Sequence, residues 1–454
     1  MIIHIVQSGE TIDSIAETYD VPVDRLIVEN GIQTPDNLAV GQTIVIIYPL
    51  QTYTIQDGDT LTSIAESQNV SLMQLLRNNP YLSDREYIYP GETIVISYDT
   101  EKVGTFATSG YAYSFFSMDI LRKTLPFLTY LTVFNYRATI DGEIIDIDDQ
   151  EVVNTAKAYG VAPMMLVSTI SEYGVGSSEV AFAILNSPDI QDRLIDNIMD
   201  IIKRKGYYGL NVYYQFLKPE NQELVENFII KISLRLKSEG YRFLVTVTPR
   251  INIEGASMDF ERIDYTTIAQ YTDGILFLSY DWGYSYGPPT SVTPVNVALE
   301  VLNYILTMIP PDKIFQGLPV IGYDWKLPYI PGYTVANAIT SDAAVQLAAD
   351  MGVPIIYSEI AQAPYFFYND PDLHIVWFKD ARSIDTIIRI VPRYGLQGTS
   401  IWNIMHFFAQ MWFIINNTFD IKKVENLNNV ENLDNVENLD NVENLDNVEN
   451  LDNF

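Results

Sequence analysis

The sequence predicts an α/β protein in which a (β/α)8 barrel follows two small β-α-α-β modules and precedes an acidic repeat tail. Three observations predict this order. A segment near the N-terminus occurs twice, with Gly9 and Gly58 at equivalent places 49 positions apart. Short apolar runs then alternate with amphipathic helical patterns, which is typical of βα units around a parallel sheet. From residue 424 the chain repeats one acidic hexad.

The composition excludes several classes of function. The chain has 454 residues and is 48% hydrophobic, enough for a large folded core. Its 27 Lys and Arg against 58 Asp and Glu give a net charge of −31, which repels nucleic acid, so we expect no such partner. The absence of Cys excludes disulfides and thiolate metal sites. The three histidines, His4, His374 and His406, are far apart, so we expect no metal ion and no cofactor.

Neither end of the chain predicts a membrane segment. Residues 1–9 have no basic region and no long apolar core, so we expect no secretory signal. The apolar stretch 401–415 is interrupted by Asn403, His406 and Gln410 and is shorter than the roughly 20 residues of a membrane span. We expect a buried strand followed by a helix there, and no membrane partner.

Each N-terminal repeat is predicted to fold as β-α-α-β, over residues 1–49 and 50–100. In each, a short strand leads to a Gly turn, and Thr11 or Thr60 is placed to cap the first helix. Second helices are expected near 23–29 and 72–78. A turn and a closing strand complete each module.

These repeats resemble the LysM module, because each opens with Gly-Glu/Asp-Thr and closes with Gly-Gln/Glu-Thr-Ile-Val-Ile. The resemblance implies binding of peptidoglycan or chitin, glycans that contain N-acetylglucosamine. The site would lie between two turns in each module, 8–11 with 37–41 and 57–60 with 89–91. Its candidate residues are Gly9, Glu10, Thr11, Gly41, Gly58, Asp59, Thr60 and Gly91. Taken singly, each Gly or Thr also fits a purely structural turn or cap.

Residues 101–423 are predicted to form the barrel, in the TIM-barrel architecture. Candidate strands lie at 105–113, 129–136, 162–169, 208–215, 242–248, 274–281, 314–321 and 397–404. Helices such as 190–205, 219–238 and 292–308 lie between them. The longest insertion is expected at 322–395. Active-site residues of such a barrel lie at the carboxyl ends of its strands.

The fourth predicted strand, 208–215, carries the pattern that points to chemistry. Alternation directs Asn211, Tyr213 and Gln215 into the barrel. Here the chain resembles glycoside hydrolase family 18, whose fourth strand reads Asp-Gly-x-Asp-x-Asp-x-Glu. It is most similar to the spore cortex-lytic N-acetylglucosaminidases of that family, which have LysM modules before the barrel. Further segments carry the resemblance: 184–186, 193–198, 279–289, 322–328, 377–383 and 400–402.

The chain departs from this motif at the two positions that matter most. The resemblance implies that the final Glu protonates the glycosidic oxygen while the substrate's acetamido group attacks, oriented by the preceding Asp. This chain has Gln215 and Tyr213 there. An amide has no titratable proton near neutral pH, so Gln215 cannot be a general acid. We therefore predict a glycan-binding barrel with impaired or absent hydrolysis. An active N-acetylglucosaminidase that uses Glu220 or Asp281 instead is the alternative.

Other sugar contacts are retained according to the resemblance. It assigns Tyr280 to the acetamido group, with Asp281 beside it as a further catalytic candidate, and Trp402 to the base of the sugar subsite. Trp282 and Trp325 are further substrate-binding candidates. Such rings also occur in protein cores, which is the competing interpretation. The implied location is the spore coat or a cortex-associated layer, after synthesis in the mother cell. Proteins of that layer are candidate partners, and a structural spore-layer protein is a third hypothesis.

The segment 424–454 is built from repeats of Val-Glu-Asn-Leu-Asp/Asn-Asn. Apolar residues at every third position drift around a helix of 3.6 residues per turn, so no amphipathic stripe forms. We expect a solvated, disordered acidic tail without chemistry. A hexapeptide β-solenoid is the alternative.

Overall fold

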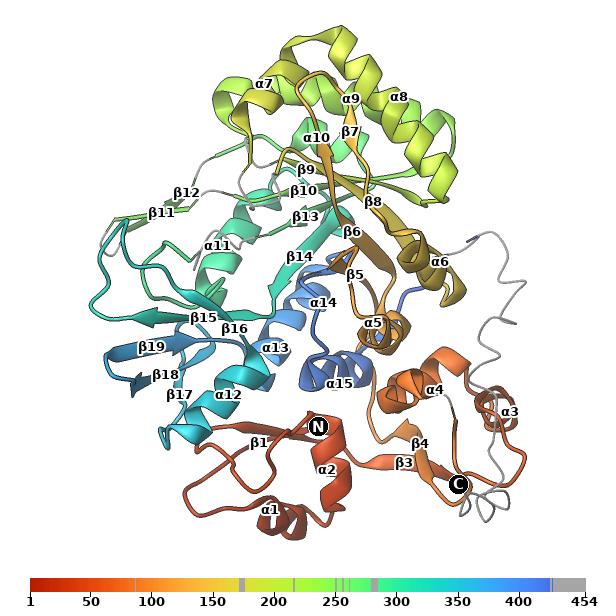
Figure 1. Cartoon of the computed structure of the whole chain (residues 1–454), viewed down its shortest axis with the longest axis vertical. Coiled ribbons are helices and arrows are strands. Elements are labelled where there is room, and N and C mark those ends of the chain that lie inside the picture. The colour runs from red at the N-terminus through yellow and green to blue at the C-terminus, as the bar shows by residue number, and fades with distance from the viewer. Residues whose placement is uncertain are drawn as a thin grey trace, which may run out of the picture.

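The protein is described by a computed structural model that covers residues 1–85, 87–170, 176–214, 217–249, 251–254, 257–260, 262–278, 285–424 and 427. Its centre is a closed barrel of eight parallel strands, as predicted (Figure 1). The strands are β5 (Thr105–Tyr113), β6 (Tyr130–Ala138), β8 (Ala162–Ser168), β9 (Gly209–Tyr214), β10 (Arg242–Val247), β13 (Gly274–Phe277), β14 (Ile314–Pro319) and β20 (Gly398–Trp402). They pair in this order, and β20 pairs with β5 to close the barrel. Each lies within or overlaps a predicted strand.

Helices cover the outside of the barrel. They are α5 (Met118–Thr124), α6 (Gln150–Ala158), α7 (Ser178–Asn186), α8 (Pro188–Lys205), α9 (Gln222–Ser238), α10 (Thr266–Tyr271), α11 (Val295–Ile305), α13 (Ala381–Ile388), α14 (Ile390–Tyr394) and α15 (Ala409–Thr418). Helix α8 shows why they begin and end where they do. The Ser187 side chain accepts from the Ile190 N–H, and Gly206 ends the helix in the left-handed region. The apolar faces of these helices and the outward side chains of the strands form one large core.

The long connection between β14 and β20 forms an inserted antiparallel sheet. Its elements are β15 (Ile321–Lys326), β16 (Asn337–Thr340), α12 (Ser341–Asp350), β17 (Ile356–Ser358), β18 (Ala363–Asn369) and β19 (Leu373–Trp377). The strand order is β16, β15, β19, β18, β17. The sheet ends at Trp377, so the insertion is shorter than the predicted 322–395. Helices α13 and α14 occupy the rest of that stretch and belong to the core of the barrel.

Both N-terminal modules have the predicted β-α-α-β order. Module 1 consists of β1 (Ile2–Ile5), α1 (Ile12–Tyr19), α2 (Val23–Asn30) and β2 (Thr43–Ile46). Module 2 consists of β3 (Pro49–Thr54), α3 (Leu61–Ser67), α4 (Leu72–Asn78), the 3-10 turn η1 (Pro80–Asp84) and β4 (Thr93–Tyr98). The predicted caps are confirmed, because Thr11 and Thr60 each exchange hydrogen bonds with the Ser three residues later.

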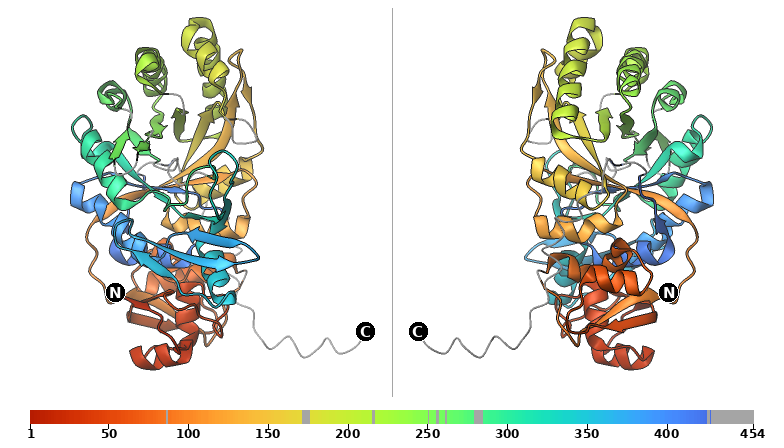
Figure 2. Two further views of the ribbon diagram at one scale, coloured as in Figure 1. Left: turned by 90° about the vertical axis from the view of Figure 1, so that its left-hand side faces the viewer. Right: turned by 90° about the vertical axis from the view of Figure 1, so that its right-hand side faces the viewer.

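The two modules pack against α15, the helix predicted within the apolar stretch 401–415. From α15, Gln410 Nε2 donates to Thr43 O of module 1 at 2.6 Å. About one and a half turns further along the same helix, Asn416 Nδ2 donates to Asn78 Oδ1 of module 2 at 2.8 Å. These polar groups are buried and paired, which fixes the orientation of each module. Figure 2 shows the modules, in red and orange, together at one end of the molecule.

Module 1 also touches the inserted sheet, at Gly41. This residue has φ +87°, and a Cβ there would lie 2.2 Å from Ile355 O. Its counterpart Gly91 in module 2 has φ +91° and open space around it. Gly41→Ala and Gly91→Ala should both suffer backbone strain of about 1–2 kcal/mol. Only Gly41→Ala forces two backbones apart, at a cost of about 1–3 kcal/mol, so its melting temperature should fall roughly 1–3 °C further. Equal losses in thermal melts of the two variants would contradict this contact.

The last described residues of the chain contact the barrel. Val424 and Leu427 pack against the core inside the barrel, and the rest of the repeat tail lies outside the described residues. In the described ranges, every helix is too short or too polar to cross a bilayer.

Candidate functional site

Trp402 is the last residue of β20 and lies half-buried at the carboxyl end of the barrel. Its ring packs against Tyr111 and Tyr113 of β5 and Phe134 of β6. The ring centroids are 5.5, 6.3 and 5.3 Å away, in tilted or edge-on arrangements. Aromatic pairs favour these arrangements. Three rings therefore fix the orientation of the indole.

The aromatic surface continues from Trp402 toward solvent. Tyr113 stacks on Phe115, with centroids 5.1 Å apart and planes 23° apart. Phe115 is 76% exposed, although it is a large apolar side chain. Tyr113 and Phe115 were not predicted as site residues from the sequence. Aromatic residues at 111, 113 and 115, every second position along the end of β5 and into the turn that follows it, were the signal that could have identified them.

Asn211 points into the barrel, as the alternation predicted, and is fully buried. Its Oδ1 accepts from Thr246 Oγ1 at 2.8 Å, and its Nδ2 donates to the Tyr111 hydroxyl at 3.5 Å. Burial raises the pKa of Tyr111 to about 12, so this network is neutral at physiological pH. Asn211 thus connects β9 to β10 and β5 beneath the aromatic surface.

Tyr213 lies two residues further along β9 and is half-buried against the inner core of the barrel. Its hydroxyl is 2.9 Å from Thr248 Oγ1, just beyond β10. The phenol of Tyr213 thus occupies the position at which the resemblance to family 18 predicts an acidic side chain. Four other predicted site residues lie outside the described residues: Gln215, Tyr280, Asp281 and Trp282.

Trp325 was predicted as a sugar contact, but the structure buries its side chain. It lies in β15 and is fully buried in the inserted sheet, with Ala336 and Ile375 around it. Its Nε1 donates to Gly287 O at 2.9 Å. As placed, neither face of the ring is open to a ligand. The side chain instead ties the sheet to the segment that follows β13.

In each module the two turns predicted to bind glycan lie side by side. The Gly41 N–H donates to Val6 O at 2.8 Å, and the Gly91 N–H donates to Ile55 O at 2.8 Å. Val6 and Ile55 directly precede the first turns, so the second turn of each module is bonded beside the first. Gly9 and Gly58, in the first turns, also have positive φ and open space around them.

The acidic residues of the first turns are engaged within those turns. Glu10 Oε2 accepts from the Gln7 N–H at 2.7 Å, and this hydrogen bond holds the pKa of the Glu10 carboxyl below its usual value. Asp59 Oδ2 accepts from the Gln56 N–H at 2.7 Å and from the Tyr53 hydroxyl at 2.9 Å. Glu10 and Asp59 thus shape equivalent turns. In the described part of the chain, no group of three or more acidic or histidine side chains is arranged to hold a metal ion.

The comparisons with known proteins match both regions. The model of glycosyl hydrolases family 18 matches residues 170–406, and the LysM domain model matches 4–46 and 53–97. A cortical fragment-lytic enzyme of Bacillus anthracis is 32% identical over 428 residues, which covers 92% of this chain and 98% of the relative. The putative sporulation-specific glycosylase YdhD of Bacillus subtilis is 29% identical, covering 93% of this chain and all of the relative.

A solved structure has the same arrangement of domains. The spore cortex-lytic enzyme SleL of Bacillus megaterium superimposes with a TM-score of 0.76 at 31% identity, and the match covers 93% of this chain and 99% of that one. The SleL structure from Bacillus cereus gives a TM-score of 0.75 at 32% identity. With its matching family model, its barrel and its near full-length relatives, the chain belongs to glycosyl hydrolases family 18 and carries two LysM domains ahead of its barrel.

Proposed function

We propose that this chain binds N-acetylglucosamine glycans, foremost the peptidoglycan of the spore cortex, and cleaves them slowly or not at all. The cortex enters the proposal because the relatives are named as cortex-lytic enzymes. One observation carries the loss of hydrolysis: the two acidic positions of the family motif hold Tyr213 and Gln215. Without a titratable proton at 215, the leaving oxygen would have to depart as an alkoxide.

Sugar binding is supported by the surface around Trp402. The indole is held by Tyr111, Tyr113 and Phe134, so its exposed part is already oriented before a ligand arrives. Apolar faces of sugar rings stack on such surfaces. A pre-oriented ring binds with a smaller entropy loss than a mobile one. The proposed domains are residues 1–49, 50–100 and 101–423, followed by the tail.

The alternative is an N-acetylglucosaminidase with a displaced acid, and the names of the relatives favour it. A general acid needs a raised pKa, which burial supplies. Glu220 lacks that burial, because its side chain is 71% exposed and lies 3.9 Å from Lys218 Nζ. Asp281, the other candidate, lies outside the described residues.

The test is a reducing-end assay of the full chain on cortex fragments and on chito-oligosaccharides, beside one active cortex-lytic relative. We expect a rate about 10²- to 10⁴-fold below that of the relative, the range that one general acid contributes. Measured binding of the same sugars would show that the protein is competent. Turnover comparable to that of the relative would refute the proposal.

A further inference from the structure

We propose that the two LysM modules are not equivalent: module 2 carries the contact with N-acetylglucosamine glycan, and module 1 is a fixed connector whose second turn is covered by the inserted sheet. This inference rests on the proposed glycan binding and assigns it to one module.

In module 1 the turn 37–41 contacts the insertion, with Ala39 and Gly41 buried at the contact and Asn37 and Val40 exposed. The Ile355 N–H donates to Val40 O at 2.8 Å. Asn37 Nδ2 donates to Asp350 Oδ1 at 3.1 Å, at the end of α12. Ala39 is 2% exposed and belongs to the core of the insertion. Its neighbours in that core include Ala344, Ala348, Ile355 and Phe366.

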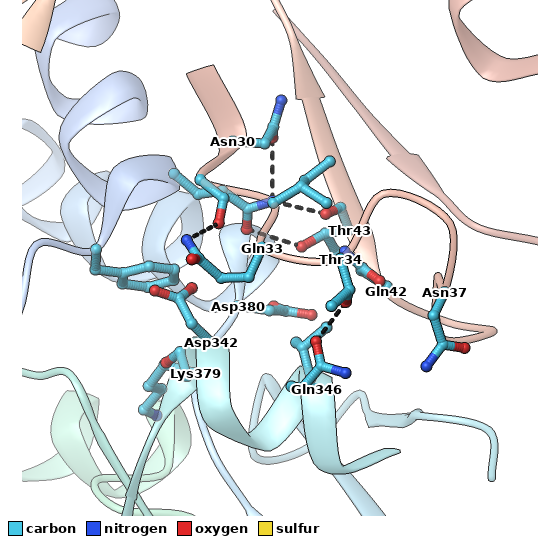
Figure 3. A pocket seen from close by; sticks show the side chains of 16 residues that line it. Asn30, Gln33, Thr34, Asn37, Gln42, Thr43, Asp342, Gln346, Lys379 and Asp380 are labelled. Carbon is cyan, nitrogen blue, oxygen red and sulfur yellow. Dashed lines mark hydrogen bonds between the residues drawn. The ribbon is translucent and has the colours of Figure 1, made fainter. Parts of the chain in front are cut away.

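Figure 3 shows this contact from close by, with Thr34 and Asn37 of module 1 facing α12. The Thr34 hydroxyl donates to Gln346 Oε1 across the junction. The cavity left between module 1 and the insertion is about 40 Å³, lined in part by Gln42, Asp342 and Lys379. That volume suits a few water molecules.

In module 2 the same turn is free of such cover. A Cβ at Gly91 or at Gly58 would meet no atom within 4 Å. Tyr89, two residues before Gly91, is 36% exposed. The two turns of this module are therefore both accessible and lie side by side.

The sequence of each turn agrees with this division. Aligning Gly41 with Gly91 places Ala39 opposite Tyr89. A small residue is needed at 39, because the side chain enters the packed core of the insertion. The aromatic side chain at 89 is 36% exposed, and a sugar ring can stack on such a ring. Ala39 thus holds module 1 against the inserted sheet, whereas the equivalent Tyr89 of module 2 is available for glycan binding.

The division can be tested by hydrogen–deuterium exchange on the full chain with and without chitohexaose. We expect protection of residues 55–60 and 87–92, and unchanged exchange in 6–11 and 37–42. Protection of both modules, or of module 1 alone, would overturn the inference and leave the proposed glycan binding intact. Protection of the barrel alone would overturn the inference and restrict binding to the barrel. No protection anywhere would overturn the inference and the proposed binding together.

Two exposed positions give a matched pair of variants for the same ligand. Tyr89→Ala should weaken binding of the full chain to insoluble peptidoglycan by about tenfold, the loss of one stacking contact of about 1.4 kcal/mol. Val40→Ala trims a 39% exposed side chain of the module 1 turn and should change binding less than twofold. A larger effect of Val40→Ala than of Tyr89→Ala would contradict the assignment. Thermal melts confirm that both variants are folded.

Discussion

The double variant Tyr213→Asp, Gln215→Glu should release reducing ends from chito-oligosaccharides about 10²- to 10⁴-fold faster than the wild-type chain. The new Glu supplies the titratable proton that the Gln215 amide lacks. The new Asp restores an anion beside the acetamido group and removes a ring that lies half-buried at the mouth of the barrel. Initial rates over pH 4–8 measure the gain. A bell-shaped profile is expected, because a general acid must be protonated and its neighbour ionised.

Single variants separate the two contributions. Gln215→Glu alone should recover part of the rate, because it restores the proton without the acetamido partner. Tyr213→Asp alone should release reducing ends no faster than the wild-type chain. Tyr213→Phe removes only the hydroxyl that contacts Thr248, so it controls for loss of that hydrogen bond. A double variant that is folded, binds the sugar and still does not cleave would show that the barrel lacks more than this pair.

The substitution Trp402→Ala should weaken binding of chito-oligosaccharides to the barrel about 30-fold. Truncating a central aromatic contact typically costs about 2 kcal/mol, and every 1.4 kcal/mol is tenfold in affinity. Part of the loss would come from the neighbouring rings, since Tyr111, Tyr113 and Phe134 would lose the side chain they hold. Isothermal titration with a trisaccharide measures the effect.

A second tryptophan serves as the control for this experiment. Trp412 lies in α15 and is fully buried, and its Nε1 has no hydrogen-bond partner among the residues that the structure describes. Trp412→Phe should therefore lower stability modestly and leave the affinity of the barrel unchanged. If Trp402→Ala and Trp412→Phe changed affinity equally, or if neither did, Trp402 would not be part of the sugar site.

Local sequence signals accounted for most of the fold. Apolar runs bounded by helical patterns placed all eight barrel strands, because a parallel strand buried on both faces must be continuously apolar. The caps at Thr11 and Thr60 were also visible, since a Ser or Thr before an apolar periodic run satisfies free N–H groups of the first turn.

Long-range contacts account for what the sequence did not reveal. The inserted sheet is antiparallel and pairs strands in an order that no local pattern encodes. Trp325 was predicted as a sugar contact because its burial depends on contacts distant in sequence. In the structure, Ala336 and Ile375 pack around it. The contact between module 1 and the inserted sheet was not predicted. The sequence shows that Ala39 aligns with Tyr89, but only the structure shows that Ala39 lies in the core of the inserted sheet.

The candidate site also has features that the sequence predicted and features that only the structure revealed. The inward direction of Asn211 and Tyr213 followed from strand alternation and is confirmed by their contacts with Thr246 and Thr248. The row formed by Trp402, Tyr113 and Phe115 joins two strands far apart in sequence, so it required the closed barrel. The sugar contacts assigned to Tyr280, Asp281 and Trp282 remain predictions.

The central claim is that the barrel holds an amino sugar chain and cuts it slowly or not at all. A crystal of the wild-type protein flash-cooled after a soak of a few seconds with chitotetraose tests this most directly. We predict an intact tetrasaccharide across the mouth of the barrel, with one ring stacked on Trp402. Density for a cleaved chain, or for an oxazoline or free disaccharide in its place, would contradict the claim.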